Sequence, residues 1–252
     1  MSTSSWHHDT SGSSSGNDSL IWLHGWGYDR KGFNRIAALF QAEGESRLYD
    51  LPGFGRTSML QEGAGTEAYA DALAAQLDAN KRHTLIGHSY GGRVAVQLAA
   101  KHPKLVKAII LVGGAGLPRK RSLSFKLKAG CLRLLGKIAH LSDALFKTKF
   151  RDAYVARFGS TDYKNAGALR ATLVSAVNEN LSNTARTLEC PALLLYGAND
   201  VDTPPEIGRK YESLIPVSRF IELKGYDHHD ILTRGAYQCE ALIKSFLKDL
   251  DT

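Results

Sequence analysis

The sequence is poor in cysteine and in long apolar runs. Its 252 residues include three cysteines, Cys131, Cys190 and Cys239, and none of them forms a C-x-x-C pair. So sparse a set argues against a disulfide scaffold or a zinc module, and it favours a reducing compartment. Strongly apolar runs stop at five residues, as in Ala108–Val112, whereas a membrane span needs about twenty. We therefore expect a cytoplasmic protein without a transmembrane segment and without a metal site.

Residues 1–19 lack an apolar stretch, hydrophobic periodicity and a basic start. This predicts no secretion signal, and the serine- and glycine-rich composition predicts a disordered tail over 1–19. The chain as a whole is 43% hydrophobic and 23% charged, which excludes disorder throughout. Its length allows one large domain or two small ones.

From Leu20 onward, short apolar runs alternate with segments of helical spacing. The predicted strands cover 20–23, 47–51, 83–87, 106–112, 192–196 and 218–223, and the predicted helices cover 33–43, 66–80, 91–102, 205–214 and 234–250. This alternation is typical of an α/β fold with a mostly parallel, doubly wound sheet that helices cover on both faces.

Residues 117–188 interrupt this rhythm, because they contain no strong strand pattern. Their most regular feature is an apolar stripe at 4-3-4-3-4 spacing, formed by Leu127, Cys131, Leu134, Ile138, Leu141 and Leu145. That spacing places the stripe on one side of a helix. We predict a helical insertion over 117–188 between core segments 20–116 and 189–252, and we expect the stripe to supply apolar surface to a binding pocket.

The sharpest local signal is Gly87-His88-Ser89-Tyr90-Gly91, which fits the pattern G-x-S-x-G between a predicted strand and a predicted helix. In that context the serine lies on a strained turn that presents its hydroxyl at the carboxyl edge of the sheet. So tight a turn needs small neighbours, and the glycines of the motif meet that need. A serine hydroxyl is a weak nucleophile at neutral pH, so it requires a base that a third group orients.

The acid and the base of such a sheet follow the serine along the chain, in that order. Asp200 and His228 each leave one of the last two predicted strands and enter a loop, which satisfies this order. We predict Asp200 as the acid and His228 as the base. Asp202 and His229 are the rivals, and Asp230 is interpreted as a loop or helix-capping carboxylate.

A negative charge that develops on the substrate oxygen needs two positioned donors. The backbone N–H of Tyr90, directly after the serine, is one candidate, and the N–H of Trp26, after the first strand, is the other. The side chains of Trp26, Tyr90 and Phe54 are then expected to line the substrate pocket. His24 and His88 are interpreted as structural hydrogen-bonding residues.

Five segments in the right order resemble the α/β-hydrolase superfamily of serine esterases and lipases with a helical cap. They are Leu23-His24-Gly25-Trp26-Gly27, Asp50-Leu51-Pro52-Gly53-Phe54-Gly55, the Ser89 turn, Gly197-Ala198-Asn199-Asp200 and the Asp227-His228 loop. The resemblance implies an α/β-hydrolase fold, hydrolysis of carboxylic esters or related acyl compounds through an acyl-enzyme, no cofactor, and a cap formed by 117–188.

Two features depart from the superfamily pattern. Only nineteen residues, most of them polar, precede the first motif strand, so we expect the usual N-terminal hairpin to be lacking and the sheet to start one or two strands short. Asp227 also stands where the superfamily commonly has glycine before its histidine, which leaves the choice between His228 and His229 less sharp.

Several functions share the same three residues. A thioesterase, a lactonase, a C–C hydrolase and a cofactor-free perhydrolase remain alternatives to an esterase. A non-catalytic hydrolase-like binding protein is a further one, although no member of the triad is missing. The His-Gly-Trp-Gly and Asp-Leu-Pro-Gly-Phe-Gly stretches also resemble those of esterases that cleave pimeloyl-carrier-protein methyl esters.

The net charge of +7 is concentrated in one segment. Between Arg119 and Arg151, ten basic residues accompany one acidic residue, Asp143, so this segment carries +9 and the rest of the chain −2. It has no nucleic-acid-binding motif, so we expect no nucleic-acid partner. We predict a small-molecule acyl substrate that is anionic or carrier-bound, or else an anionic lipid surface. The plainer alternative is a solvated helix face.

Overall fold

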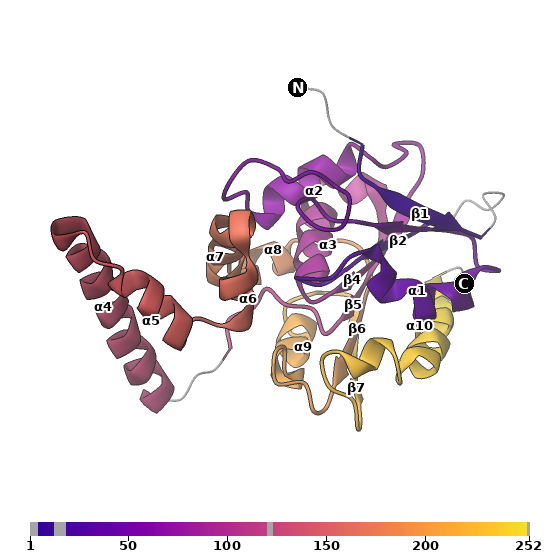
Figure 1. Ribbon diagram of the computed structural model, residues 1–252. Helices are drawn as coiled ribbons and strands as arrows, with labels where there is room; N and C mark the ends of the chain where they lie inside the picture. Colours follow the sequence, from indigo (N-terminus) through magenta and orange to yellow (C-terminus); the bar gives the residue numbers. More distant parts are fainter. Residues whose placement is uncertain (1–4, 13–18, 120–122, 251–252) are drawn as a thin grey trace.

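The computed structural model describes residues 5–12, 19–119 and 123–250. A seven-stranded sheet with the order β1-β3-β2-β4-β5-β6-β7 runs through its centre (Figure 1). The strands are β1 (His8–Ser11), β2 (Ser19–Leu23), β3 (Glu45–Tyr49), β4 (His83–His88), β5 (Val106–Val112), β6 (Ala192–Gly197) and β7 (Ser218–Leu223). Every neighbouring pair is parallel except β1 and β3, which are antiparallel. The prediction of a mostly parallel α/β sheet is therefore confirmed.

Helices cover both faces of the sheet. Those outside the insertion are η1 (Arg30–Phe33), α1 (Asn34–Ala37), η2 (Ala38–Phe40), α2 (Thr66–Ala74), α3 (Tyr90–Lys101), η3 (Pro103–Leu105), α9 (Pro205–Glu212), η5 (Asp230–Leu232) and α10 (Ala236–Leu250). Strand β2 shows the division: Ile21 and Leu23 face the core that includes α2, α3 and α9, whereas Leu20 and Trp22 face the core that includes α1 and α10. A strand buried on both faces needs apolar residues at every position, as this one has.

The prediction of a disordered tail over 1–19 is wrong for the described part of that range. Strand β1 pairs with β3 at the edge of the sheet, and the Trp6 side chain is only 3% exposed. The His7 N–H donates to the Thr57 hydroxyl at 2.9 Å, and Asp9 forms a 2.7 Å ion pair with Arg30. Backbone pairing and one buried indole hold this strand, so it carries no apolar periodicity that the sequence could reveal. Residues 1–4 and 13–18 lie outside the described residues.

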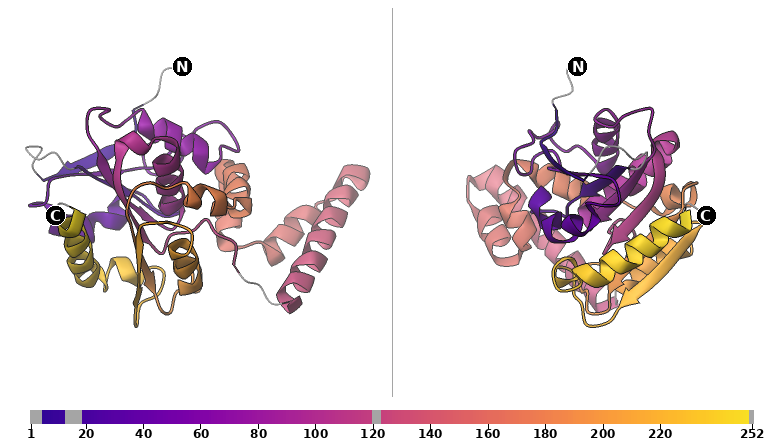
Figure 2. Two further views of the ribbon diagram at one scale, coloured as in Figure 1. Left: turned by 180° about the vertical axis from the view of Figure 1, so that it is seen from behind. Right: turned by 90° about the vertical axis from the view of Figure 1, so that its right-hand side faces the viewer.

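Between β5 and β6, the described residues form helices joined by loops. The helices are α4 (Leu123–Phe146), α5 (Phe150–Phe158), α6 (Thr161–Asn165), η4 (Gly167–Leu169), α7 (Arg170–Asn178) and α8 (Ser182–Arg186). Helices α4 and α5 form a hairpin that projects from the body, whereas α6, α7 and α8 lie close to it (Figures 1 and 2). Within the described ranges, no helix combines the length and apolarity that crossing a bilayer would require.

Candidate active site

The turn between β4 and α3 holds Ser89 in an unusual backbone conformation, with φ 48° and ψ −107°. A non-glycine residue with positive φ is strained, and such strain persists only where the surroundings enforce it. A Cβ on Gly87 would lie 2.6 Å from the Gly91 carbonyl oxygen, and one on Gly91 would lie 2.0 Å from the Leu23 carbonyl oxygen. The motif glycines are therefore sterically required, and the turn lifts the Ser89 side chain above the sheet edge.

His228 and Asp200 meet at the same edge. His228 lies in the loop after β7 and Asp200 in the loop after β6, and the His228 Nδ1 is 2.6 Å from the Asp200 Oδ2. Both residues are buried: His228 is 6% exposed and Asp200 is 3% exposed. Because a carboxylate only accepts, Nδ1 carries the proton, and the tautomer of His228 leaves Nε2 able to take another.

Asp200 is held by several further donors. Its Oδ1 accepts from the backbone N–H groups of Asp202 and Thr203 at 2.8 and 2.7 Å, and the Thr203 hydroxyl lies 2.8 Å from Oδ2. Burial raises the pKa of Asp200, but the hydrogen bonds from His228 and Thr203 outweigh it and hold the pKa below its usual value. The carboxylate is therefore charged and fixed in direction at neutral pH.

His24 and His88 have the structural roles that the sequence indicates. The His88 Nε2–H donates to the His228 carbonyl at 2.9 Å, and burial lowers the pKa of His88 to about 3, so the ring stays neutral. His24 donates from Nδ1 to the Gly25 carbonyl at 2.8 Å and accepts at Nε2 from the Leu51 N–H at 3.0 Å. The two rings tie together the loops that surround Ser89.

The rivals of Asp200 and His228 make other contacts. The His229 Nδ1 is 2.9 Å from the Tyr28 hydroxyl. The hydrogen bond to Asp200 is made by His228. Asp227, in the place of the common glycine, accepts from the backbone N–H groups of His229 and Asp230 at 2.8 Å each. Asp227 thus orders the loop, and Asp230 opens η5 as the predicted loop carboxylate.

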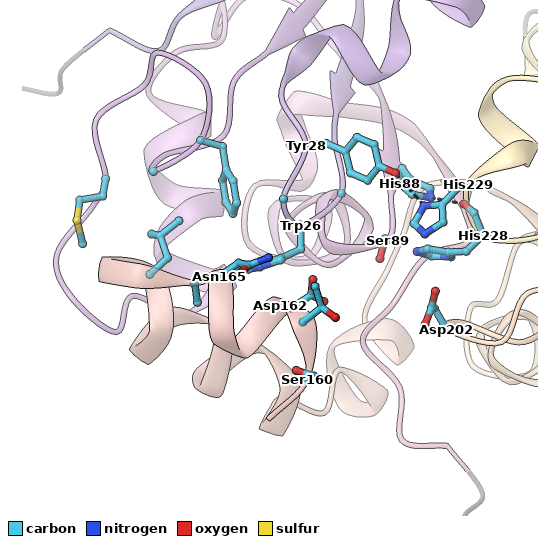
Figure 3. Close-up of a pocket in the computed structure, with 18 of the residues that line it drawn as sticks. Trp26, Tyr28, His88, Ser89, Ser160, Asp162, Asn165, Asp202, His228 and His229 are labelled. Atoms are coloured by element: carbon cyan, nitrogen blue, oxygen red, sulfur yellow. Dashed lines mark hydrogen bonds between the residues drawn. The ribbon is translucent and has the colours of Figure 1, made fainter. Parts of the chain in front are cut away.

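Ser89 and His228 line one cavity of about 1200 Å³ (Figure 3). Trp26 and Phe54 line it as predicted, with their rings edge to face at 5.0 Å. Part of the wall belongs to the insertion and comprises Ser160, Thr161, Asp162, Asn165, Ala166, Ala168 and Leu169. Figure 3 shows the carboxylates of Asp162 and Asp202 close to Ser89 and His228. The described lining includes no lysine or arginine.

Two expectations about the pocket are wrong. The Tyr90 side chain is not part of the lining; it is 3% exposed and packs edge to face beneath Trp26 and Tyr69. The other expectation concerns the α4 stripe: Cys131, Leu134, Ile138, Leu141 and Leu145 are absent from the described lining, because the α4–α5 hairpin projects away from the body. The side chain of Leu127, the first member of the stripe, lies outside the described ones. Of the basic segment, Arg119 reaches the edge of the site, where its Nη1 is 3.3 Å from the Asp202 carbonyl.

Sequence reasoning missed Thr203 and the lining residues of α6. Thr203 follows Asp200 by three residues just before Pro204 and Pro205, and a threonine at this spacing often closes a turn on a preceding aspartate. That signal was available. No sequence motif marks Asp162 and Asn165 as lining residues of the cavity, because their position depends on where the insertion folds back over the body.

Comparison with known proteins identifies the class. Residues 20–237 match the alpha/beta hydrolase family, and the chain belongs to that family. Among solved structures it is similar to a thermophilic esterase from Thermogutta terrifontis, with a TM-score of 0.70 and 24% identity over 98% of this chain and 94% of the other. MenH from S. aureus has a TM-score of 0.72 and 22% identity over 98% and 99%. These two likenesses concern the fold.

The curated relatives are more specific. The chain is 31% identical over 229 residues to the pimeloyl-[acyl-carrier protein] methyl ester esterase of Chromobacterium violaceum. The aligned region covers 85% of this chain and 88% of the relative. The chain is 29% identical over 240 residues to the enzyme of the same name from Neisseria meningitidis serogroup C, which covers 90% and 92%.

Proposed function

We propose that this protein hydrolyses carboxylic esters, with Ser89 as the nucleophile, His228 as the base and Asp200 as the group that orients the base. The observation that carries the proposal is the 2.6 Å hydrogen bond between Asp200 and His228. His228 lines the same cavity as Ser89, whose backbone is strained. Membership of the alpha/beta hydrolase family and the esterase relatives support it.

In the first half-reaction Ser89 Oγ attacks the ester carbonyl carbon while His228 Nε2 takes the hydroxyl proton. Asp200 stabilises the imidazolium that forms. The oxyanion is held by the backbone N–H groups of Trp26 and Tyr90. Tyr90 is the first residue of α3, where N–H groups have no partner within the helix. A Cβ built on Gly25 would lie 3.4 Å from the Ser89 Cβ, so the loop that carries Trp26 is close enough to serve.

Collapse of the tetrahedral intermediate breaks the bond to the alkoxy oxygen, which leaves as the alcohol with the proton from His228. In the second half-reaction His228 removes a proton from water, and the hydroxide attacks the acyl-enzyme. The carboxylic acid is released, and Ser89 regains its proton from His228. No redox change occurs, and the net reaction consumes one water per ester.

For the substrate, we infer an acyl ester that is attached to a carrier protein and whose reacting end is uncharged. The relatives are named for a methyl ester of a carrier-bound acyl chain. Asp162 and Asp202 are exposed and line the cavity without a lysine or arginine in its described wall, so a free carboxylate there would meet repulsion that solvent screens in part. A neutral ester enters without that cost, and the same repulsion favours release of the acid product.

The insertion over 117–188 is proposed to serve as the cap in part only. Residues 160–169 supply the wall opposite the sheet loops, and Leu169 lies against the Gly53 turn, where a Cβ would be 2.5 Å from a Leu169 methyl carbon. The α4–α5 hairpin takes no part in the described lining, so it needs a separate explanation.

The direct test is labelling of the intact protein with a fluorophosphonate, followed by peptide mass spectrometry. We expect the label on Ser89. Replacing Ser89 with Ala should abolish labelling and lower kcat/KM for p-nitrophenyl esters by a factor on the order of 10⁴–10⁶. Ser160→Ala, which changes another serine of the same cavity, should retain most activity. Hydrolysis that survives in Ser89→Ala would contradict the proposal.

The substrate class can be tested with matched compounds. A monomethyl ester of a dicarboxylic acyl chain on an acyl carrier protein should be cleaved. Hydrolysis of the equivalent thioester and of a lactone, measured in parallel, distinguishes an esterase from a thioesterase or a lactonase with the same three residues. Asp162→Asn should increase inhibition by the free-acid product, since one repelling carboxylate is lost. Equal inhibition of both proteins would contradict the role of Asp162.

A further inference from the structure

The α4–α5 hairpin carries an exposed apolar surface, which we call the outer face. It consists of Leu134, Ile138, Leu141 and Leu145 on α4, together with Phe146 at the end of α4 and Phe150 at the start of α5. Each of these side chains is at least 51% exposed, and Phe146 reaches 74%. A contiguous apolar surface of this kind marks an interaction site, because exposing it to water is unfavourable.

Packing within the hairpin does not cover the outer face, because α5 lies on the other side of α4. The Tyr154 hydroxyl donates to the Leu132 carbonyl at 2.7 Å, and a Cβ on Gly136 would lie 3.2 Å from the Tyr154 ring. Leu132 and Gly136 precede Leu134 and Ile138 by two residues, which is about 200° around an α-helix. Figure 1 shows α5 between α4 and the body, so the outer face points away from both.

Positive charge accompanies this surface. Residues 119–151 carry a net +9, with Asp143 as their one acid. Asp143 accepts from the Thr148 hydroxyl and from the Phe150 N–H, so it closes the turn between the two helices. The exposed lysines among the hairpin side chains that the structure describes are Lys137, Lys147 and Lys149. A helix with an apolar face and abundant flanking cations is typical of segments that lie in the interface of an anionic membrane.

Charge complementarity decides between the possible occupants. A second copy of the chain would bring two segments of +9 together, which opposes association through this face. An acidic protein would match the charge, but it would also have to offer a long apolar counterpart to the leucine and phenylalanine side chains. An anionic bilayer supplies both, since acyl chains lie directly beneath its charged headgroups.

We propose that the outer face docks the protein on an anionic phospholipid membrane, with α4 lying in the interface plane. No helix in the described part of the chain is suited to span the bilayer, which fits docking rather than insertion. The link to the cavity is short, because α5 ends at Phe158 and α6, which lines the cavity, begins at Thr161. The proposal does not depend on the proposed hydrolysis.

The test is co-sedimentation of the full chain with vesicles of phosphatidylcholine alone and with vesicles that also contain phosphatidylglycerol. We expect binding to the anionic vesicles only, weakened by salt because the lysines are exposed. The triple change Ile138→Ser, Leu141→Ser and Phe146→Ser should lower the partition coefficient at least tenfold. The matched control is Val217→Ser with Tyr237→Ser, which removes apolar side chains of similar exposure, 57% and 64%, from the body.

A second set of variants separates charge from apolar contact. Lys137→Ser, Lys147→Ser and Lys149→Ser together should abolish the preference for anionic vesicles. The same change at Lys31, Lys224 and Lys248, which are exposed on the body, should leave the preference intact. All variants should hydrolyse a water-dissolved p-nitrophenyl ester at the wild-type rate if the proposed function holds, and circular dichroism checks their fold if it does not.

Cys131 offers a direct readout of depth. It belongs to the same stripe and is exposed, whereas Cys190 and Cys239 are buried. An environment-sensitive fluorophore on Cys131 should brighten and shift to the blue when anionic vesicles are added. Equal binding to both vesicle types, or an unchanged fluorophore, would overturn the proposal. A second outcome would also overturn the proposal: the protein does not bind vesicles, but sedimentation shows a dimer or a complex with an acidic carrier protein. The changes at Ile138, Leu141 and Phe146 would then disrupt that dimer or complex.

Discussion

The sheet body and the α4–α5 hairpin use the same kind of apolar repeat with opposite results. Helix α10 buries Ala236, Cys239 and Ile243 against the sheet, whereas α4 leaves Leu134 and Ile138 in solvent at the same 3–4 spacing. The repeat determines which side of a helix is apolar. What covers that side depends on whether another surface lies within reach.

Polar groups show the same contrast. In the body, Asp50 is buried and accepts from the Arg30 side chain at 2.9 Å and from the backbone N–H groups of Arg30 and Arg56 at 2.9 Å each. In the hairpin, Asp143 serves one local turn. Asp50 therefore stabilises contacts between distant segments, whereas Asp143 stabilises a turn between neighbours along the chain. Five experiments can test this difference, in order of decreasing expected effect.

The largest effect is expected in activity. Asp200→Asn should lower kcat by about 10⁴, because an amide favours the wrong tautomer of His228. Asp202→Asn, two residues away, and Asp143→Asn, in the hairpin, should leave kcat close to wild type. Steady-state kinetics on a p-nitrophenyl ester measures all three. A larger loss in Asp202→Asn than in Asp200→Asn would reverse the assignment of the acid.

A stability difference of the next size is expected between Asp50 and Asp143. Asp50→Asn removes the buried one of the two carboxylates that pair with Arg30, so that Asp9 is the remaining one. It should lower the free energy of unfolding by about 3–5 kcal/mol, because the donors around Asp50 lose a buried charge. Asp143→Asn keeps an acceptor oxygen for Thr148 and Phe150, so it should cost far less. Urea unfolding at pH 7 makes the comparison, and equal costs would contradict it.

The same pair predicts a pH dependence. Burial raises the pKa of Asp50, but the hydrogen bonds from Arg30 and Arg56 and the charge of Arg30 outweigh it, so the pKa is lowered. The stabilisation is therefore complete above the unfolded-state pKa of about 3.9, and it is lost as the pH falls through the lower folded-state pKa. The gap between wild type and Asp50→Asn should accordingly narrow in acid.

Two isoleucines test the packing contrast directly. Ile110 on β5 is fully buried and Ile138 on α4 is 51% exposed. Ile110→Ala should cost about 2–5 kcal/mol of unfolding free energy through lost burial and a residual cavity, whereas Ile138→Ala should stay within about 0.5 kcal/mol. Denaturant unfolding without vesicles gives both numbers. A large cost at Ile138 would mean that the outer face is already covered.

The smallest effect concerns Thr203. Thr203→Val removes a hydroxyl that donates its one proton to the Asp200 Oδ2 at 2.8 Å, with the Gly113 carbonyl as a competing acceptor at the same 2.8 Å. We expect kcat to fall about 10- to 150-fold, since a hydrogen bond to a charged group is worth about 1.5–3 kcal/mol. KM should not change, because Thr203 is not part of the described cavity wall. Thr161→Val, in that wall, should affect KM instead.

Sequence patterns were sufficient for the sheet strands from β2 to β7 and for the placement of Ser89, His228 and Asp200 at one edge. Each of these signals is local: an apolar run, a glycine-flanked serine, a polar residue where a strand ends. Strand β1 escaped prediction because it is held by pairing with β3 and by the burial of Trp6. Those contacts join segments about forty residues apart, and composition does not record them.

The sequence by itself determined the order of the elements, the strained turn at Ser89 and the apolar side of α4, because all three depend on residues within a few positions of one another. The tertiary structure decided which carboxylate meets His228, which part of the insertion walls the cavity, and that the stripe on α4 faces outward. These outcomes depend on packing between distant segments. The stripe would be part of a core if α5 packed against it. It is exposed because α5 packs against the opposite side of α4, at Leu132 and Gly136.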